Sequence, residues 1–404
     1  MKALVLVAMT LLSIGLAEAQ EALDHWHLRN ATPLTRVRFT GGLFIGLGSN
    51  GKIMTSPDGA NWTARSSGTA ATLRGVAFRT GLTSPNIVPP FVIVGSSGVL
   101  TSTNGTDWAL GANLGDLNDV VWNGSKFVTV ATRSSVSGGN SFTSSDGTNW
   151  MTGTFPLTGG QAGPPDGSQG AYYTGPVAAG GGWLITAGGT QFGWDILRSF
   201  DGLNWQYVGF SDQVATGIVY GNKTFTLVGW EGWPRVTTNS LATNWVSVVD
   251  TNNVVVLPPG GLPIMVGSDI CFGNGTFLVA RSYLTNGILT TTNGFAWKKR
   301  PALAGVSMES FAFGKGTFVG VGRSGTYQSD PVAPAVMVAS RNSASNAMDL
   351  LISGEVGRAY RLQTSATLSA WSDSLSFTNT LPTMEFLDPV DPNAAQLFYR
   401  VVSP

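Results

Sequence analysis

The stretch Ser56-Pro57-Asp58-Gly59-Ala60-Asn61-Trp62 decides the fold, because versions of it recur along the chain. Each copy reads Ser/Thr-x-Asp/Asn-Gly-x-x-Trp, and we call it the turn motif. Asp or Asn followed by Gly favours a tight hairpin turn, because these residues tolerate positive φ. The Trp begins the next strand and is expected to pack on the apolar layer beneath the turn. Further copies lie at Ser102–Trp108, Ser144–Trp150, Ser199–Trp205 and Thr291–Trp297, and a degraded copy ends at Trp245.

The turn motif is predicted to stabilise the fold rather than to catalyse a reaction. Its hydroxyl and its carboxylate or amide oxygens can accept hydrogen bonds from backbone amides inside the turn. Its Trp ties the turn to the sheet. We therefore assign structural roles to Asp58, Trp62, Asn104, Trp108, Asp146, Trp150, Asp201, Trp205, Asn293 and Trp297.

The turn motif ends a longer repeat that contains two Gly- and Phe-bearing apolar segments. Successive motif tryptophans lie 46, 42, 55, 40 and 52 residues apart. A repeat of about 40–50 residues with about four short strands is typical of a β-propeller blade. The units are Val37–Trp62, Val76–Trp108, Val120–Trp150, Val177–Trp205, Ile218–Trp245 and Ile270–Trp297, and a seventh begins at Phe311 and fades at Asp330.

The seventh unit has no Trp of its own, and Trp26 near the start of the chain is the candidate to replace it. We predict that Leu23–Asn30 forms the outer strand of the seventh blade. Such pairing would remove an exposed sheet edge. The predicted fold class is therefore all-β, with a seven-bladed β-propeller closed by the N-terminal strand and followed by a small β-sandwich.

The chain divides into four predicted segments. Residues 1–19 have a charged start, a short apolar run and a small-x-small site, as secretory signal peptides do. Residues 20–330 form the propeller, and 331–334 form a Pro-containing linker. Residues 335–404 lack the turn motif, and their short alternating runs predict a β-sandwich module. The expected location is outside the cytoplasm: extracellular, periplasmic or cell-surface.

The turn motifs resemble the Asp-box (BNR) repeats of sialidase-like propellers over residues 23–330, and residues 335–404 resemble C-terminal accessory modules of secreted bacterial proteins. The resemblance implies a propeller architecture. In the sialidase box one residue separates Asp from Gly, whereas here Gly follows Asp directly. The sialidase catalytic domain also has six blades, so both differences argue against sialidase activity.

Composition excludes several partners and cofactors. Lys plus Arg and Asp plus Glu number 23 each, and 11% of residues are charged. Nucleic acids and anionic membrane surfaces call for a basic excess, so neither is expected. Cys271 is predicted to be a buried, inert thiol, and His25 and His27 lack a third metal ligand. We expect no cofactor, no metal, no membrane insertion and a monomer.

Candidate ligand-binding residues lie in the loops between the second and third strands of the predicted blades. Variable loops on a rigid scaffold commonly carry function. Arginine can grip carboxylates or sulfates, and Trp and Tyr can stack on sugar rings. An alternative is that these side chains pair locally or cover blade edges. The candidates are Arg133, Trp194, Trp230, Trp233, Arg235, Arg281, Tyr283 and Arg323.

Catalytic residues are not identified, and Asp195 and Glu231 are only weak candidates. Glycoside hydrolysis needs two carboxyl groups at a set separation, and Asp119, Asp269 and Glu309 are equally available. We predict a non-enzymatic protein that binds a glycan or an exported protein. The alternatives are a carbohydrate-active enzyme, either a sialidase-like glycoside hydrolase or a lyase, and an assembly factor that resembles the seven-bladed photosystem-assembly propellers.

Overall fold

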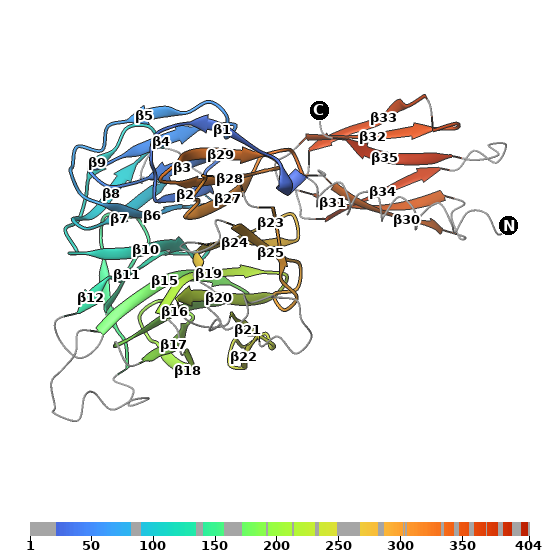
Figure 1. Ribbon diagram of the computed structural model, residues 1–404. Coiled ribbons are helices and arrows are strands. Elements are labelled where there is room, and N and C mark those ends of the chain that lie inside the picture. Colours follow the sequence, from blue (N-terminus) through green and yellow to red (C-terminus); the bar gives the residue numbers. More distant parts are fainter. Residues whose placement is uncertain are drawn as a thin grey trace. The chain divides into compact units, whose positions relative to one another are not determined.

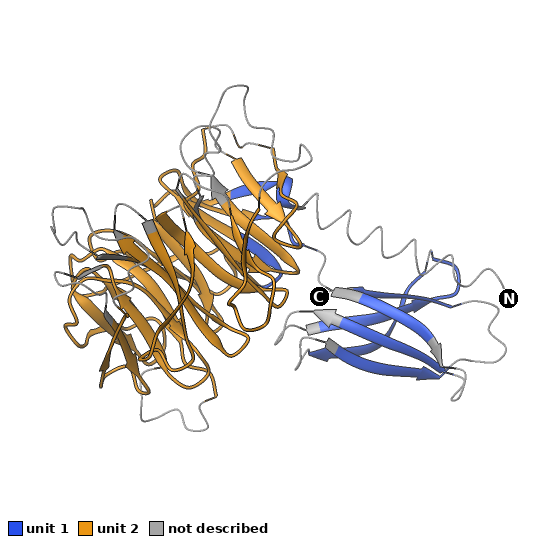
Figure 2. Cartoon of the chain, turned by 90° about the horizontal axis from the view of Figure 1, so that it is seen from below, with its two compact units in different colours: residues 1–27, 315–318, 329–404 blue, residues 28–314, 319–328 orange. Residues whose placement is uncertain are grey.

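The computed structural model describes residues 22–81, 90–134, 140–156, 172–190, 193–211, 214–230, 234–248, 267–281, 287–301, 303, 305–332, 335–342, 347–354, 359–368, 370–378, 383–389 and 397–402. The expected signal peptide lies outside these ranges. The chain divides into two compact units (Figure 2). One unit comprises residues 28–314 and 319–328, and the other comprises residues 1–27, 315–318 and 329–404.

The described residues form seven sheets of four or five strands and two of three (Figure 1). The first sheet holds β2 (Arg36–Thr40), β3 (Leu43–Leu47), β4 (Ile53–Ser56) and β5 (Thr63–Arg65). The second holds β6 (Leu73–Phe78), β7 (Phe91–Gly95), β8 (Gly98–Ser102) and β9 (Ala109–Leu110). The third holds β10 (Leu117–Trp122), β11 (Phe127–Ala131), β13 (Asn140–Ser144) and β14 (Met151–Thr154).

The next three sheets continue this order along the chain. The fourth holds β12 (Arg133–Ser134), β15 (Tyr172–Gly180), β16 (Trp183–Thr190), β17 (Gly193–Ser199) and β18 (Gln206–Ser211). The fifth holds β19 (Val214–Gly221), β20 (Thr224–Trp230), β21 (Arg235–Thr237) and β22 (Trp245–Ser247). The sixth holds β23 (Gly267–Gly273), β24 (Thr276–Arg281), β25 (Gly287–Thr291) and β26 (Lys298–Lys299).

The seventh sheet joins distant parts of the chain in the order β1 (Trp26–Asn30), β29 (Gly325–Ser329), β28 (Thr317–Gly322) and β27 (Ser310–Gly314). A short 3-10 helix, Ala22–Asp24, precedes β1. Trp26 Nε1 donates to the carbonyl of Leu23 at 2.8 Å, three residues earlier. This is the bond that Trp62 makes to Gly59, also at 2.8 Å. Trp26 therefore makes the same hydrogen bond as a motif tryptophan, on a strand that neighbours β29.

The first strands of successive sheets are the innermost ones. β6 contacts β2 and β10, β15 contacts β10 and β19, and β23 contacts β19 and β27. β27 also contacts β2. Second strands such as β7, which reads Phe-Val-Ile-Val-Gly, are buried along their whole length. A continuous apolar run is expected for a strand covered on both faces.

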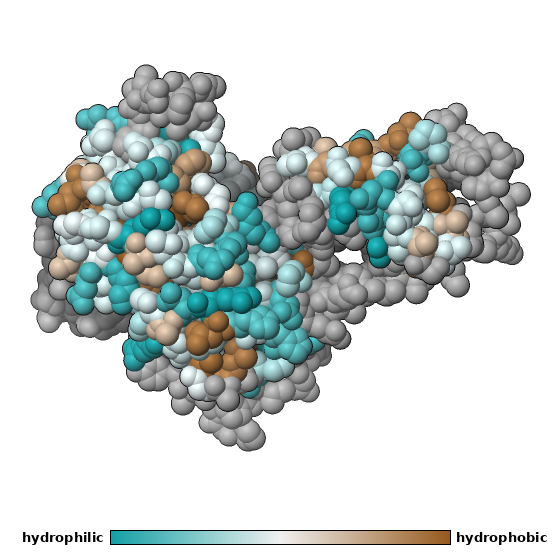
Figure 3. Space-filling view, turned by 90° about the horizontal axis from the view of Figure 1, so that it is seen from above, coloured by the Kyte–Doolittle hydropathy of each residue, from teal (hydrophilic) through white to brown (hydrophobic). Residues whose placement is uncertain are grey.

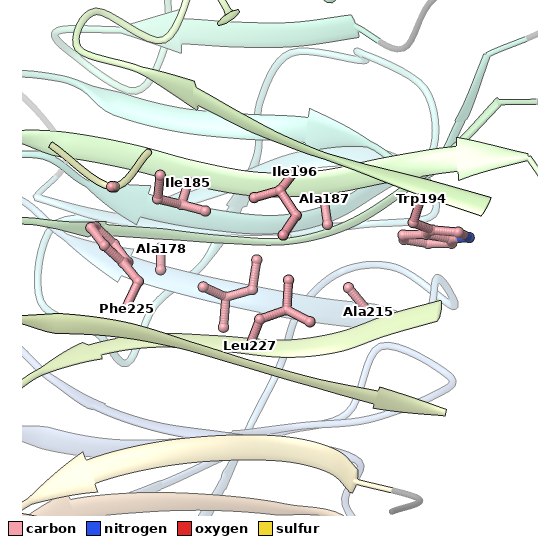
Figure 4. Close-up of a cluster of buried hydrophobic side chains, with 10 residues drawn as sticks. Ala178, Ile185, Ala187, Trp194, Ile196, Ala215, Phe225 and Leu227 are labelled. Carbon is pink, nitrogen blue, oxygen red and sulfur yellow. The ribbon is translucent and has the colours of Figure 1, made fainter. Parts of the chain in front are cut away.

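Hydrophobic clusters lie between consecutive sheets rather than in one central mass. In Figure 4, Ile185 and Ile196 of the fourth sheet meet Phe225 and Leu227 of the fifth. All four are at most 2% exposed. Each blade-like sheet therefore depends on its neighbours for burial of both faces, as in other repeat architectures.

The turn motifs adopt the predicted hairpins. Ser56 Oγ accepts the Gly59 amide at 2.8 Å. Asp58 Oδ1 accepts the amides of Ala60 at 2.9 Å and Asn61 at 2.8 Å. Gly59 has a φ of +80°, a value that favours glycine. The same pattern of bonds recurs around Ser102, Ser144, Ser199 and Thr291.

Acidification should weaken the three motifs that carry Asp. Partial burial acts to raise the pKa of Asp58, but hydrogen bonds from Asn61, Ala60 and Ser56 outweigh it and lower this pKa to about 2. The pKa of Asp201 is lowered to about 2 in the same way, and the pKa of Asp146 is also lowered. Because the folded pKa is depressed, the stabilisation is present above the ordinary value of 3.8 and is lost as pH falls from there towards 2.

A triple variant, Asp58→Asn, Asp146→Asn and Asp201→Asn, tests this expectation. Asn104 and Asn293 already serve in two motifs, so Asn should preserve the turns without titrating. The urea midpoint of the wild type should fall more between pH 5 and pH 2 than that of the variant. Equal losses in the two proteins would show that these carboxylates do not govern acid stability.

The C-terminal module, residues 335–404, forms two three-stranded sheets. One has the order β30 (Ala335–Asn342), β31 (Ala347–Gly354) and β34 (Thr383–Pro389). The other has the order β33 (Ser372–Thr378), β32 (Ala359–Ser365) and β35 (Phe398–Val402). Leu350 and Ile352 of the first sheet share a buried cluster with Leu362 and Tyr399 of the second. Burial and a 2.6 Å hydrogen bond to Asp388 raise the pKa of the Tyr399 hydroxyl.

The module also contains a turn of the motif type, which corrects the expectation that it lacks one. Ser365 Oγ accepts the amide of Leu368 at 2.9 Å, and Trp371 Nε1 donates to the carbonyl of Leu368 at 3.0 Å. Leu368 occupies the glycine position with a φ of +66°. The turn was missed because its sequence has no Asp-Gly pair. Leu368, a non-glycine residue, therefore adopts the left-handed conformation, which usually costs about 1–2 kcal/mol.

No helix in the described ranges is long and apolar enough to cross a membrane.

Candidate functional site

The predicted loop residues lie on several sheets. Arg133 lies on β12 and pairs with Tyr173, so it extends the fourth sheet rather than the third. Arg281 is the last residue of β24, opposite Gly287. Arg323 lies between β28 and β29; its side chain is 89% exposed and its Nε lies 3.3 Å from Glu309.

Among the aromatic candidates, Trp194 is less accessible than expected. Trp194 on β17 is 6% exposed and belongs to the cluster of Figure 4, so its ring packs in the core. Trp230 ends β20 opposite Val214, and Arg235 begins β21 and is half-buried. Trp233, Tyr283 and Glu231 lie outside the described residues. Asp195 is 8% exposed on β17.

A charged cluster lies on the inner strands, and we call it the inner-strand cluster. It consists of Arg36, Arg38, Asp119, Asp269 and Ser310, from β2, β10, β23 and β27. Arg36, Asp119 and Asp269 each precede the apolar residue that begins a sequence repeat. The strand register shifts beside Asp119 and Asp269, as at a β-bulge. Bulges can turn a side chain away from its regular direction.

Asp269 holds the basic side of the inner-strand cluster together. It is 1% exposed. Arg38 Nη1 donates to Asp269 Oδ2 at 2.7 Å, and Arg36 Nη1 lies 3.3 Å from Oδ1. Ser310 donates its hydroxyl to Oδ2 at 2.5 Å. Burial acts to raise the pKa of Asp269, but the two arginines and these hydrogen bonds lower it overall. Residues separated by more than 200 positions in sequence are thus joined.

Asp119 has fewer described hydrogen-bond partners than Asp269. It is 4% exposed, and among the described contacts its carboxylate accepts one hydrogen bond, from the Val120 amide at 2.9 Å. Burial is the main reason that the pKa of Asp119 is raised, although Arg38 and Arg36 attract its charge. The carboxylate forms no ion pair with a residue that the structure describes.

Gly75 on β6 makes room for this carboxylate. A Cβ atom at Gly75 would lie 2.6 Å from Asp119 Oδ1 and 2.8 Å from the backbone nitrogen of Val120. Both distances are shorter than van der Waals contact. The position of Asp119 therefore requires glycine on the neighbouring strand.

Sequence reasoning found only part of this cluster. It noted Asp119 and Asp269 as available carboxylates but gave no role to Arg36 or Arg38. Charged residues at one repeated position within otherwise apolar strands were the signal that could have identified them. Glu309, the third such carboxylate, lies beside Arg323 instead.

No group of three or more His, Cys, Asp or Glu side chains suited to a metal ion occurs in the part of the chain that the structure describes. Cys271 on β23 is 8% exposed. Burial is the main cause that raises the pKa of its thiol, and the negative charge of Asp269 raises this pKa further. A thiol with a raised pKa is a poor nucleophile at neutral pH, in agreement with an inert role.

Comparisons with known proteins show the fold. No protein-family model and no curated protein matches the chain. It is similar to the solved structure of YCF48 bound to D1 peptide, with 15% identity, a TM-score of 0.51, and coverage of 75% of this chain and 96% of that one. YCF48 from Cyanidioschyzon merolae gives 16% identity, a TM-score of 0.54, and coverage of 76% and 99%.

A third similar structure is the extracellular domain of the putative hybrid two component system BT4673 from B. thetaiotaomicron. It gives 8% identity, a TM-score of 0.52, and coverage of 88% of this chain and 52% of that one. At these identities the likeness concerns the fold alone. It confirms the predicted all-β, propeller-like architecture.

Proposed function

We propose that this protein is an exported, non-enzymatic, seven-bladed β-propeller, closed by its N-terminal strand, that binds a protein or peptide partner. The partner contacts the face that carries the loops between second and third strands, which include Arg133, Arg281 and Arg323. The turn motifs are structural devices of the Asp-box type.

Contacts between first strands support the seven-bladed ring. They run from β2 through β6, β10, β15, β19 and β23 to β27, and β27 contacts β2. The hydrogen bonds of β1 also support closure. Arg29 Nε donates to Gln328 Oε1 at 2.9 Å, and Gln328 Nε2 donates to the carbonyl of Asp58 at 2.8 Å. The first turn motif is thereby tied to β29 and β1.

The observation that carries the binding role is the pairing of Asp269 and Glu309, which leaves Asp119 as the one of these three carboxylates without an ion pair to a described residue. Asp269 pairs with Arg36 and Arg38, and Glu309 lies beside Arg323. Glycoside hydrolysis needs two carboxyl groups that face the substrate, and carboxylates held in ion pairs do not serve it well.

A protein partner is favoured over a glycan by two observations. One similar propeller was solved with a bound peptide. Trp194, one of the rings expected to stack on sugars, is buried. On the side of the molecule shown in Figure 3, hydrophobic areas are separated by polar ones.

Peptide and glycan arrays probed with residues 20–404 test the proposal. We expect peptide binding that an Arg281→Ala/Trp230→Ala double variant weakens about tenfold or more, the loss of about 1.4 kcal/mol or more. Arg79→Ala is the control, because Arg79 follows the first strand of its sheet and donates to the carbonyl of Ser145 at the other end of the strands. Binding of glycans alone, or equal binding by all variants, would contradict the proposal.

A further inference from the structure

Asp119 is the least satisfied charged group of the inner-strand cluster. Two carboxylate oxygens offer about four acceptor sites, yet the described residues supply one donor, the Val120 amide. With 4% of the residue exposed, solvent reaches it poorly. Burying a carboxylate without partners is costly, so a donor from outside the chain would be bound favourably there.

The arginines of the cluster remain accessible although they lie on an inner strand. The side chain of Arg38 is 28% exposed and that of Arg36 is 16% exposed. Arg38 uses Nη1 for Val37, Asp269 and Ser310, and Nη2 lies 3.4 Å from Asp269. Its Nε bonds to no residue within the described ranges. A guanidinium has five N–H donors, so acceptors can still be added.

The charges of the cluster restrict which ligands can bind to Asp119 and the arginines together. A simple cation near Asp119 would be repelled by Arg36 and Arg38. A simple anion near the arginines would be repelled by Asp119 and Asp269. Such repulsions are strong where solvent screening is weak. A molecule that carries both charges meets neither penalty.

We propose that the inner-strand cluster binds a small zwitterion of the α-amino-acid type. Its ammonium group donates to the Asp119 carboxylate, and its carboxylate accepts from the guanidinium groups of Arg36 and Arg38. Gly75 leaves room for the Asp119 carboxylate, because a Cβ atom there would clash with it. This proposal does not depend on the proposed partner interface.

Glycine is the first probe, because it carries the two charged groups with the least additional volume. Binding to the full chain is measured by calorimetry and by the shift in thermal midpoint. N-acetylglycine, which lacks the ammonium group, and glycinamide, which lacks the carboxylate, are the matched ligands. We expect glycine to bind at least about tenfold more tightly than either, since a charge-assisted hydrogen bond contributes about 1.5–3 kcal/mol.

Asp119→Asn should weaken glycine binding about tenfold or more for the same reason. Asp116→Asn is the control, because Asp116 is paired with Arg74 and is not a member of the cluster. If Asp119→Asn fails to fold, the comparison of glycine, N-acetylglycine and glycinamide binding to the wild type still tests the proposal. The proposal is overturned if glycine does not bind, if either blocked ligand binds equally well, or if a folded Asp119→Asn protein binds glycine unchanged.

Discussion

Asp269→Asn should lower the free energy of unfolding by about 3–5 kcal/mol, because removing one partner of a buried ion pair leaves the others uncompensated. Asp269 is 1% exposed and receives donors from Arg36, Arg38 and Ser310. The amide of Asn keeps the size of the side chain but removes the charge that opposes two guanidinium groups. Urea unfolding followed by tryptophan fluorescence and by circular dichroism gives the change.

Two exposed ion pairs serve as controls for Asp269→Asn. Asp116→Asn removes the partner of Arg74, whose pair has side chains 28% and 44% exposed. Arg323→Ala removes the neighbour of Glu309, and the side chain of Arg323 is 89% exposed. Exposed pairs usually contribute about 0–1 kcal/mol. If Asp269→Asn costs no more than these two variants, the inner-strand cluster does not hold the first sheet to the sixth and seventh.

Trp297→Ala should be the most destabilising substitution within a turn motif. We expect it to lower the free energy of unfolding by about 3–5 kcal/mol. Trp297 is 1% exposed and packs with Ile270, Phe277 and Leu289 of the sixth sheet. Its indole nitrogen bonds to no group that the structure describes, so its contribution comes from packing. The urea midpoint and the transition slope at pH 7 measure the loss.

Phe295 supplies the matched control in the same turn. It is 42% exposed, so Phe295→Ala should cost less than about 1 kcal/mol. Trp62→Ala should fall between the two variants, because Trp62 is half-buried but bonds to Gly59. Equal losses for Trp297→Ala and Phe295→Ala would mean that the motif tryptophans do not anchor the turns to the sheets.

The turn motifs were predictable because their determinants are local. The hydroxyl of Ser56, the carboxylate of Asp58 and the positive φ of Gly59 act within seven residues, so one reading of the sequence locates every strong copy. Where the local chemistry differs, prediction failed. Leu368 takes the glycine position in the C-terminal module, and no Asp-Gly pair marks that turn.

The buried or exposed state of the site candidates was not predictable in the same way. Trp194 follows a loop in sequence, yet its ring lies in the cluster between the fourth and fifth sheets. Its environment depends on Ala215 and Leu227, residues of the next sheet. Arg133 likewise joins the fourth sheet through Tyr173, a residue forty positions later.

The sequence by itself determined the all-β class, the repeated strands and the positions of their turns, because hairpin chemistry and apolar alternation are short-range properties. Only the tertiary structure decided that Arg38, Asp269 and Ser310 are joined by hydrogen bonds, and that Asp119 of the same inner-strand cluster accepts one described hydrogen bond, from the Val120 amide. These residues come from strands more than a hundred positions apart in several cases. Their proximity depends on how the sheets pack, which no local pattern records.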